Sequence, residues 1–211
     1  MPFKYACFIS YRNGQRQLME RIITDLSTAL ANELEAWLDL EVYVDRERLQ
    51  GGVLYNEALA QALCESVCMI VIFTPTYFSK THSYCAREYK AMEKLETARL
   101  HALGQQTDPK HGLIIPIVFR GAEALPDDIK ERRHYYKFDD FLLSDVEISK
   151  HPAYAPKIRE IARTIYDHHQ RLSTLPTDLC QHCRQFTLPS EADILPWLET
   201  VQGSVTPFPG R

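Results

Sequence analysis

The apolar and polar positions of the chain alternate between two repeats, one typical of buried strands and one typical of helices. Short, nearly continuous apolar runs predict strands, and Val42 and Val44 add one more because they alternate with polar neighbours. The runs cover residues 5–10, 67–74 and 113–119, with a short candidate at 135–138. Longer segments carry apolar residues at helical spacing, most clearly every fourth position from Leu18 to Leu38. Helices are predicted over residues 17–38, 55–64, 84–103 and 158–172.

Strands that alternate with helices predict a parallel sheet with helices on both faces, which is the doubly wound α/β class. Ligands of such sheets bind beyond the carboxyl ends of the strands, where the strand order reverses. This rule nominates residues 10–14, 45–52 and 74–83 as the rim of a site. Ser83, directly before a predicted helix, is expected to be its N-cap.

Length and composition indicate one principal domain with an appendage. The 211 residues are too few for two full-sized cores, and proline becomes frequent after Leu172. We expect a domain over residues 1–172 and a Pro-rich tail or small appendage over 173–211. The net charge of -4 argues against direct nucleic-acid binding. No apolar run reaches the roughly 20 residues of a membrane helix, and no secretory signal is visible, so we expect a cytoplasmic protein without membrane contact.

Six cysteines are spread over the chain, and we expect all of them to be free thiols of a reducing compartment. Cys180 and Cys183 form a CxxC pair that, with His168 or His169, offers zinc ligands as an alternative, although a second pair at a recognisable spacing is missing. We therefore expect no metal. Cys85 has no legible histidine partner, and we do not propose a thiol enzyme.

Tyr84 and Glu88 stand four residues apart at the start of a predicted helix, so both side chains can face one pocket. Two plainer interpretations remain open. Glu88 as a solvated carboxylate is favoured near a helix N-terminus by the helix dipole, and Tyr84 can simply pack in the core.

Three segments together resemble the sequence boxes of TIR domains. They are FISYR at residues 8–12, DRERLQGG at 45–52 followed by YNEAL, and SYCAREY at 83–89, in the order and spacing of that family. The resemblance covers roughly residues 2–172. It implies a flavodoxin-like, five-stranded parallel sheet with helices on both faces. It also implies, for the bacterial type, cleavage of the nicotinamide–ribose bond of NAD.

In that resemblance Glu88 matches the catalytic glutamate. Nicotinamide leaves as a neutral molecule, so no general acid is needed, unlike in ordinary glycosidases. A carboxylate that stabilises the ribosyl oxocarbenium ion is then sufficient. NAD is the substrate, so no cofactor is expected. The expected activity is that of an NAD glycohydrolase or ADP-ribosyl cyclase in bacterial antiphage signalling or NAD depletion.

The remaining expected substrate-binding residues lie on the same rim. The set is Ser10, Tyr11, Arg12, Asp45, Arg46, Leu49 and Tyr84. Arg12 could hold the diphosphate, and Tyr84 stands where the family often has tryptophan. Arg12 as a plain surface cation and Asp45 as a loop-capping aspartate remain alternatives.

The loop at residues 45–52 mediates assembly between TIR domains in the family. We therefore expect a homo-oligomer on activation, and a separate sensor or effector protein as a further partner. The main alternative is a non-catalytic TIR adaptor. A receiver or other flavodoxin-like nucleotide binder ranks lower, because the sequence lacks clustered acidic strand ends and a GxGxxG loop.

Overall fold

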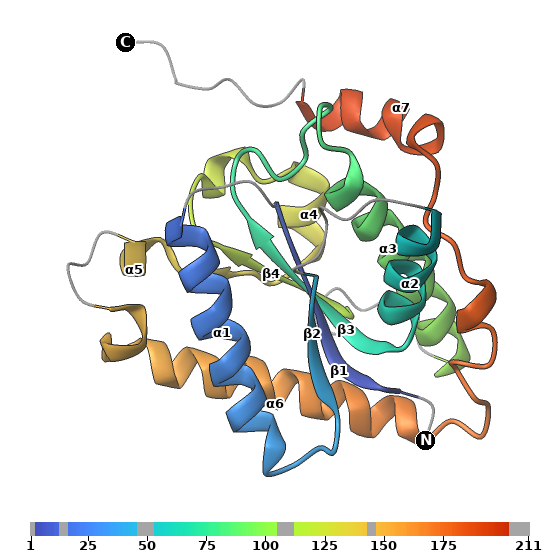
Figure 1. Cartoon of the computed structure of the whole chain (residues 1–211), viewed down its shortest axis with the longest axis horizontal. Helices are drawn as coiled ribbons and strands as arrows, with labels where there is room; N and C mark the ends of the chain where they lie inside the picture. Colours follow the sequence, from blue (N-terminus) through green and yellow to red (C-terminus); the bar gives the residue numbers. More distant parts are fainter. Residues whose placement is uncertain (1–2, 13–16, 46–52, 105–111, 143–146, 203–211) are drawn as a thin grey trace.

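The chain folds around one parallel sheet of five strands. The computed structural model describes residues 3–12, 17–45, 53–104, 112–142 and 147–202 (Figure 1). The strands are β1 (Tyr5–Tyr11), β2 (Glu41–Val44), β3 (Ser66–Phe73), β4 (Ile114–Val118) and β5 (Tyr136–Lys137). Their order is β2-β1-β3-β4-β5, and every neighbouring pair is parallel. This is the flavodoxin-like order, which confirms the predicted fold class and places the reversal of strand order between β1 and β3.

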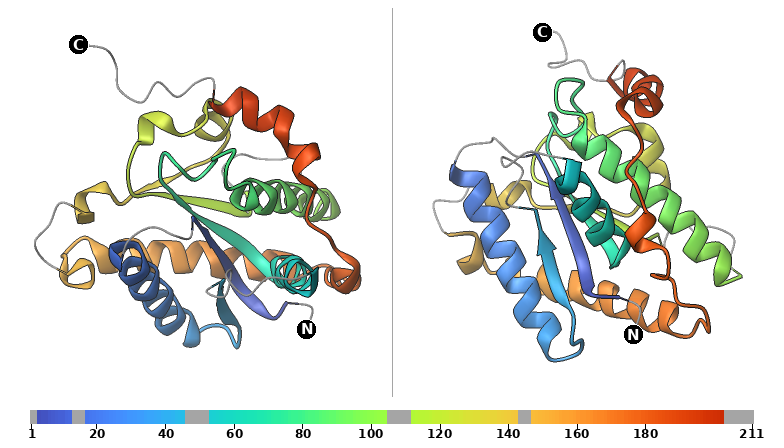
Figure 2. Two further views of the ribbon diagram at one scale, coloured as in Figure 1. Left: turned by 45° about the horizontal axis from the view of Figure 1, so that its top comes forward. Right: turned by 45° about the vertical axis from the view of Figure 1, so that its right-hand side comes forward.

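Helices cover both faces of the sheet (Figure 2). One face is covered by α1 (Gln17–Glu35) and α6 (Tyr154–Ser173), which pack on each other, and the other by α2 (Val53–Cys64) and α3 (Tyr84–Ala102). The first helix was predicted to reach residue 38 but ends at Glu35. There the carbonyl of Leu34 accepts hydrogen bonds from the amides of both Trp37 and Leu38, at 2.8 Å each, in a turn toward β2.

Short helices between residues 122 and 150 were not predicted, because elements of three to six residues show no hydrophobic period. They are η2 (Ala122–Ala124), α4 (Asp127–Arg132), α5 (Asp139–Leu142) and η3 (Ile148–Lys150). At the turn before η2, Gly121 has a φ of 70°, and a Cβ there would lie 2.4 Å from Cγ of Pro75. Only glycine fits this approach of two loops without strain.

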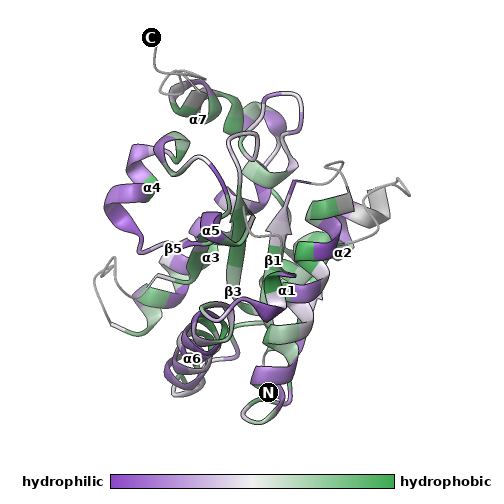
Figure 3. Cartoon of the chain, turned by 90° about the vertical axis from the view of Figure 1, so that its left-hand side faces the viewer, coloured by the Kyte–Doolittle hydropathy of each residue, from purple (hydrophilic) through white to green (hydrophobic). Residues whose placement is uncertain are grey.

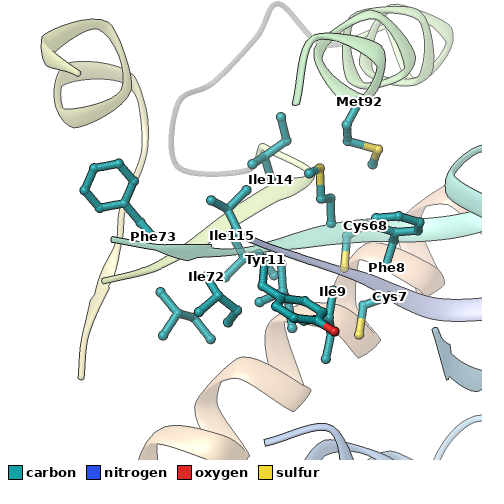
Figure 4. Packing of buried hydrophobic residues seen from close by; sticks show 14 of the residues in the cluster. Cys7, Phe8, Ile9, Tyr11, Cys68, Ile72, Phe73, Met92, Ile114 and Ile115 are labelled. Carbon is teal, nitrogen blue, oxygen red and sulfur yellow. The ribbon is translucent and has the colours of Figure 1, made fainter. Parts of the chain in front are cut away.

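The core lies on both faces of the two central strands. Every residue of β1 and of β3 is buried, and their apolar side chains pack against those of β4 and α3 (Figure 4). In Figure 3 the green of hydrophobic residues follows β3, whereas α6 carries many purple, hydrophilic residues. Strands covered on both faces need continuous apolar runs, which is why these were legible in the sequence.

A buried ion pair ties α3 to the segment after α4. The guanidinium of Arg133 donates to both carboxylate oxygens of Glu96, at 2.8 and 2.6 Å, and the amide of Ile114 donates to the same carboxylate at 3.3 Å. Burial lowers the pKa of Arg133, but the hydrogen bonds and charges of Glu96 and Tyr89 outweigh it and raise that pKa above its ordinary value. Such a bidentate pair holds its two elements in one geometry.

The residues after α6 form a strap along the α2 and α3 side of the molecule (Figure 2). We call residues 174–202 the C-terminal strap; it contains η4 (Cys183–Gln185) and α7 (Glu191–Gln202). Trp197 of α7 stacks on Tyr89 with ring centroids 5.6 Å apart, and contacts Phe78 edge-on at 5.0 Å. The tail of the chain is therefore packed on α3, and its helix was not predicted. The division of the chain at residue 172 stays a prediction.

The expectation of free thiols was wrong for two cysteines. Cys64, the last residue of α2, forms a disulfide with Cys183 of the strap, 119 residues later. Cys7, Cys68 and Cys85 are buried and Cys180 is half-buried, and none of these four forms a disulfide. The pair was invisible in the sequence because only the fold brings the strap to the end of α2. Because the sulfur of Cys183 is bonded to Cys64, the CxxC pair does not offer two thiolates to zinc.

Two further properties bear on the sequence-based expectations. Within the described ranges, no group of three or more histidine, cysteine, aspartate or glutamate side chains could hold a metal ion. Of the helices in those same ranges, none is long and apolar enough to cross a membrane.

Candidate functional site

Three polar side chains meet at the carboxyl end of β1, beside the point where the strand order reverses. The Ser10 hydroxyl donates a hydrogen bond of 2.5 Å to Oε2 of Glu88, and lies 2.6 Å from the hydroxyl of Tyr77. Ser10 comes from β1, Glu88 from the second turn of α3, and Tyr77 from the connection between β3 and α3. The structure thus joins two residues predicted from the sequence with one that was missed.

The hydrogen bonds have a direction. A serine hydroxyl carries one proton, and an ionised carboxylate only accepts. When Glu88 is ionised, the Ser10 hydroxyl donates its one proton to the carboxylate. Ser10 then has no proton left for Tyr77, so the Tyr77 hydroxyl donates to the serine oxygen. The result is a chain of donors from Tyr77 through Ser10 to Glu88, which fixes one carboxylate oxygen in place.

This cluster is closed to solvent in the structure. Glu88, Ser10 and Tyr77 are each 0% exposed. The interpretation of Glu88 as a solvated helix residue is therefore wrong, because β1 and the β3–α3 connection cover that side of α3. A carboxylate needs hydrogen-bond donors to remain ionised at such depth, and Ser10 supplies one.

Two further contacts tie the strand ends together around the cluster. The Tyr11 hydroxyl donates to the backbone carbonyl of Asp45 at 3.1 Å, linking the ends of β1 and β2. The guanidinium of Arg12 donates to the backbone carbonyl of Thr76 at 3.1 Å, linking the end of β1 to the β3–α3 connection. Asp45 is itself buried. The predicted rim residues from all three strands are therefore neighbours, as expected for parallel strands that end on one edge.

The structure describes one of the three remaining predicted residues, Tyr84. Tyr84 is half-buried, and the guanidinium of Arg87 lies 5.1 Å from its ring centroid. Arg46 and Leu49 lie outside the described residues, as does the rest of the 46–52 loop.

The strap holds the first turn of α3, next to Glu88. Ser83 occupies the N-cap position, but its hydroxyl makes no capping hydrogen bond and donates instead to the carboxylate of Glu191 in α7. The Nε of Arg87 donates to the carbonyl of Pro189 at 2.6 Å. The expected cap is therefore wrong in its side-chain role, because the backbone of Ser83 is helical, with φ -70° and ψ -12°, whereas a capping serine has an extended backbone that lets its oxygen accept from the next amides.

Tyr77 is the site residue that the sequence analysis did not single out. It was inside the nominated rim of residues 74–83, two positions after Pro75, in the segment TPTYF. An aromatic residue in a polar loop was a signal that it packs inward, and it is buried against Phe73 and Phe78.

The fold and this cluster define a doubly wound α/β domain with a polar site at the switch point between β1 and β3. Comparison with known families then places it more closely. The family model described as TIR domain matches residues 7–147, which is more than half of the chain and includes all three members of the cluster. The chain belongs to the TIR domain family. No match was found among curated proteins. None was found among solved structures either.

Proposed function

We propose that this TIR domain cleaves the nicotinamide–ribose bond of NAD, with Glu88 as its catalytic carboxylate. The observation that carries the proposal is the position of Glu88 at the switch point, hydrogen-bonded to Ser10 at the end of a central strand. Ligands of doubly wound sheets bind at this edge. The family includes NAD-cleaving enzymes, which supports the choice of substrate.

The reaction needs one negative charge in a fixed place. As the glycosidic bond breaks, its electron pair passes to the nicotinamide nitrogen and cancels the positive charge there. The cationic ribosyl group that remains is stabilised by the carboxylate of Glu88. Water then bonds to the ribosyl carbon and loses a proton to solvent. In a cyclase an adenine ring nitrogen bonds to that carbon instead, and the proton is lost from the exocyclic amino group of the base. Because Ser10 and Tyr77 hold the carboxylate before substrate arrives, little reorganisation is needed at the moment of reaction.

The neighbouring residues have proposed roles in binding. Arg12 would give up its hydrogen bond to the Thr76 carbonyl for the diphosphate, and Tyr84 would face the nicotinamide or ribose. Asp45, Arg46 and Leu49 would complete the rim. Since Glu88 is 0% exposed, we propose that the closed form opens when TIR subunits assemble through the 45–52 loop. In the cell, a cytoplasmic enzyme of this kind would act in bacterial immune signalling or NAD depletion, with a separate sensor or effector.

The test measures nicotinamide release from NAD by chromatography, over a wide range of protein concentration. Glu88→Gln keeps the side-chain volume and removes the charge, so release should fall at least about 100-fold, the scale of losing one electrostatic transition-state contact. Glu131→Gln makes the same chemical change at an exposed position of α4 and should leave release unchanged. Equal release in wild type and Glu88→Gln refutes the role of Glu88.

A non-catalytic TIR adaptor is the second candidate, and the burial of Glu88 favours it. A carboxylate that is 0% exposed and bonded to Ser10 can serve the fold alone. In that case the wild type releases no nicotinamide at any concentration, even where light scattering shows assembly. Assembly without turnover would therefore support the adaptor, and turnover that depends on Glu88 would exclude it.

A further inference from the structure

Three cysteines meet where the strap crosses the end of α2. Cys183 is disulfide-bonded to Cys64 with Cα atoms 5.3 Å apart, and the Cys180 thiol lies 3.7 Å from the carbonyl oxygen of Cys64. The free thiol therefore lies beside the disulfide, next to one of the two residues that form it.

The local backbone also brings Cys180 close to Cys183. The amide of Cys183 donates to the carbonyl of Cys180 at 3.0 Å, which closes a four-residue turn. Such turns place their end Cα atoms less than about 7 Å apart. Disulfides span Cα distances of about 4.4–6.8 Å. Cys183 thus has two partners within reach, one on α2 and one in its own turn.

A buried cation, Arg99, lies beside the Cys64 backbone and interacts electrostatically with Cys180. The guanidinium of Arg99 donates to the carbonyls of Cys64 at 2.5 Å and Ser66 at 2.8 Å, and is 2% exposed. Burial raises the pKa of Cys180 to about 11, and Arg99 partly offsets this, while Asp178 and Glu65 add to it. Arg99 is therefore placed to stabilise the attacking thiolate of Cys180.

We propose that Cys64, Cys180 and Cys183 form a thiol–disulfide exchange site, at which Cys183 changes its partner from Cys64 to Cys180 and frees the strap from α2. Cys180 first loses its proton to water. Its thiolate attacks Sγ of Cys183, the Cys64–Cys183 bond breaks, and Cys64 leaves as a thiolate that takes a proton from water. One disulfide is exchanged for another, so no oxidant or reductant is consumed.

The exchange would act on the first turn of α3. In the bonded form the strap is anchored at Cys183, and its next residues hold Arg87 through Pro189 and Ser83 through Glu191. After exchange only non-covalent contacts hold the strap against α2 and α3. The inference stands on the cysteine cluster and is independent of the proposed NAD cleavage.

The test maps the disulfides of the oxidised full chain. The protein is incubated at pH 7 and pH 9 without reductant, quenched with acid, alkylated and analysed by peptide mass spectrometry. We expect labelled Cys64 to appear together with a Cys180–Cys183 disulfide, about tenfold faster for each pH unit, because the thiolate fraction rises tenfold per unit below the pKa. Cys7, whose pKa burial raises to about 12, is the internal control, because it becomes labelled only on unfolding.

Two variants sharpen the result. Cys180→Ser should keep the Cys64–Cys183 bond and leave Cys64 unlabelled at both pH values. Cys64→Ser in a glutathione redox buffer should form the Cys180–Cys183 bond. The proposal is overturned if Cys180 remains the labelled cysteine in wild type at pH 7 and pH 9 alike, or if Cys64 is labelled as fast in Cys180→Ser as in wild type.

Discussion

Removing the Ser10 hydroxyl should destabilise the fold well beyond an ordinary serine substitution. Ser10 is 0% exposed and donates to the equally buried carboxylate of Glu88 at 2.5 Å. A hydrogen bond to a charged group contributes about 1.5–3 kcal/mol, and the bond from Tyr77 about 1 kcal/mol more. Ser10→Ala should therefore lower the free energy of unfolding by about 2.5–4 kcal/mol, a large fraction of the roughly 5–15 kcal/mol by which domains are stable.

The measurement is urea unfolding followed by circular dichroism, with the slope of the free energy against urea compared between variants. An unchanged slope shows that the midpoint shift reports stability. Tyr77→Phe is the matched control, because it removes one hydroxyl of the same chain of donors without touching the bond to the carboxylate. It should cost about 1 kcal/mol.

A double-mutant cycle measures how much the negative charge of Glu88 strengthens its hydrogen bond with Ser10. In Glu88→Gln the acceptor remains but is neutral, and neutral hydrogen bonds are roughly half as strong as charge-assisted ones. Ser10→Ala should then cost about 1 kcal/mol less in the Glu88→Gln background than in wild type. An equal cost in both backgrounds, or a wild-type cost below about 0.5 kcal/mol, would refute the idea that Ser10 stabilises an ionised, buried carboxylate.

Three other predictions concern stability, and each is checked by urea unfolding. Arg133→Met leaves the buried carboxylate of Glu96 without its guanidinium partner and should lower the free energy of unfolding by about 3–5 kcal/mol. A loss below about 1 kcal/mol, typical of surface pairs, would contradict the buried pair. Gly121→Ala should cost more than Gly104→Ala, because both have φ near 70° but only the former Cβ meets a neighbour within 4 Å; equal losses would contradict this. Burial lowers the pKa of His169, so the unfolded chain binds a proton first as pH falls below about 6.5, and stability should fall from pH 7 to pH 5. His169→Gln should flatten that slope, and an unchanged slope would exclude His169 as its source.

The central sheet and its main helices were predictable, and the strap was not. The continuous apolar runs of β1, β3 and β4 reflect burial on both faces. The apolar residue at every fourth position from Ile22 to Leu34 reflects one buried helix face, whereas Leu18, at the start of that repeat, is exposed. By contrast, α7 carries a proline and a mixed pattern, and its packing depends on Trp197 meeting Tyr89 across the chain. A contact between distant segments leaves no local period to detect.

Part of the candidate site was also predictable. Ser10 and Glu88 were named because motif position and the strand-end rule agree, and the structure places their side chains in contact. The closure of the cluster was not predictable, because the burial of Glu88 depends on Tyr77 and on how the β3–α3 connection folds over it.

The sequence by itself determined the fold class, the edge of the sheet at which a site forms, and the carboxylate to test there. The fold class and the edge depend on the burial period and on the alternation of strands and helices, which are written locally along the chain, and the carboxylate depends on the resemblance of residues 83–89 to a TIR sequence box. Tertiary structure alone decided the direction of the donors to Glu88, its exclusion from solvent and the disulfide from Cys64 to Cys183. These depend on the meeting of side chains that are 67 to 119 residues apart. Such meetings are set by packing of the whole chain, and no local pattern encodes them.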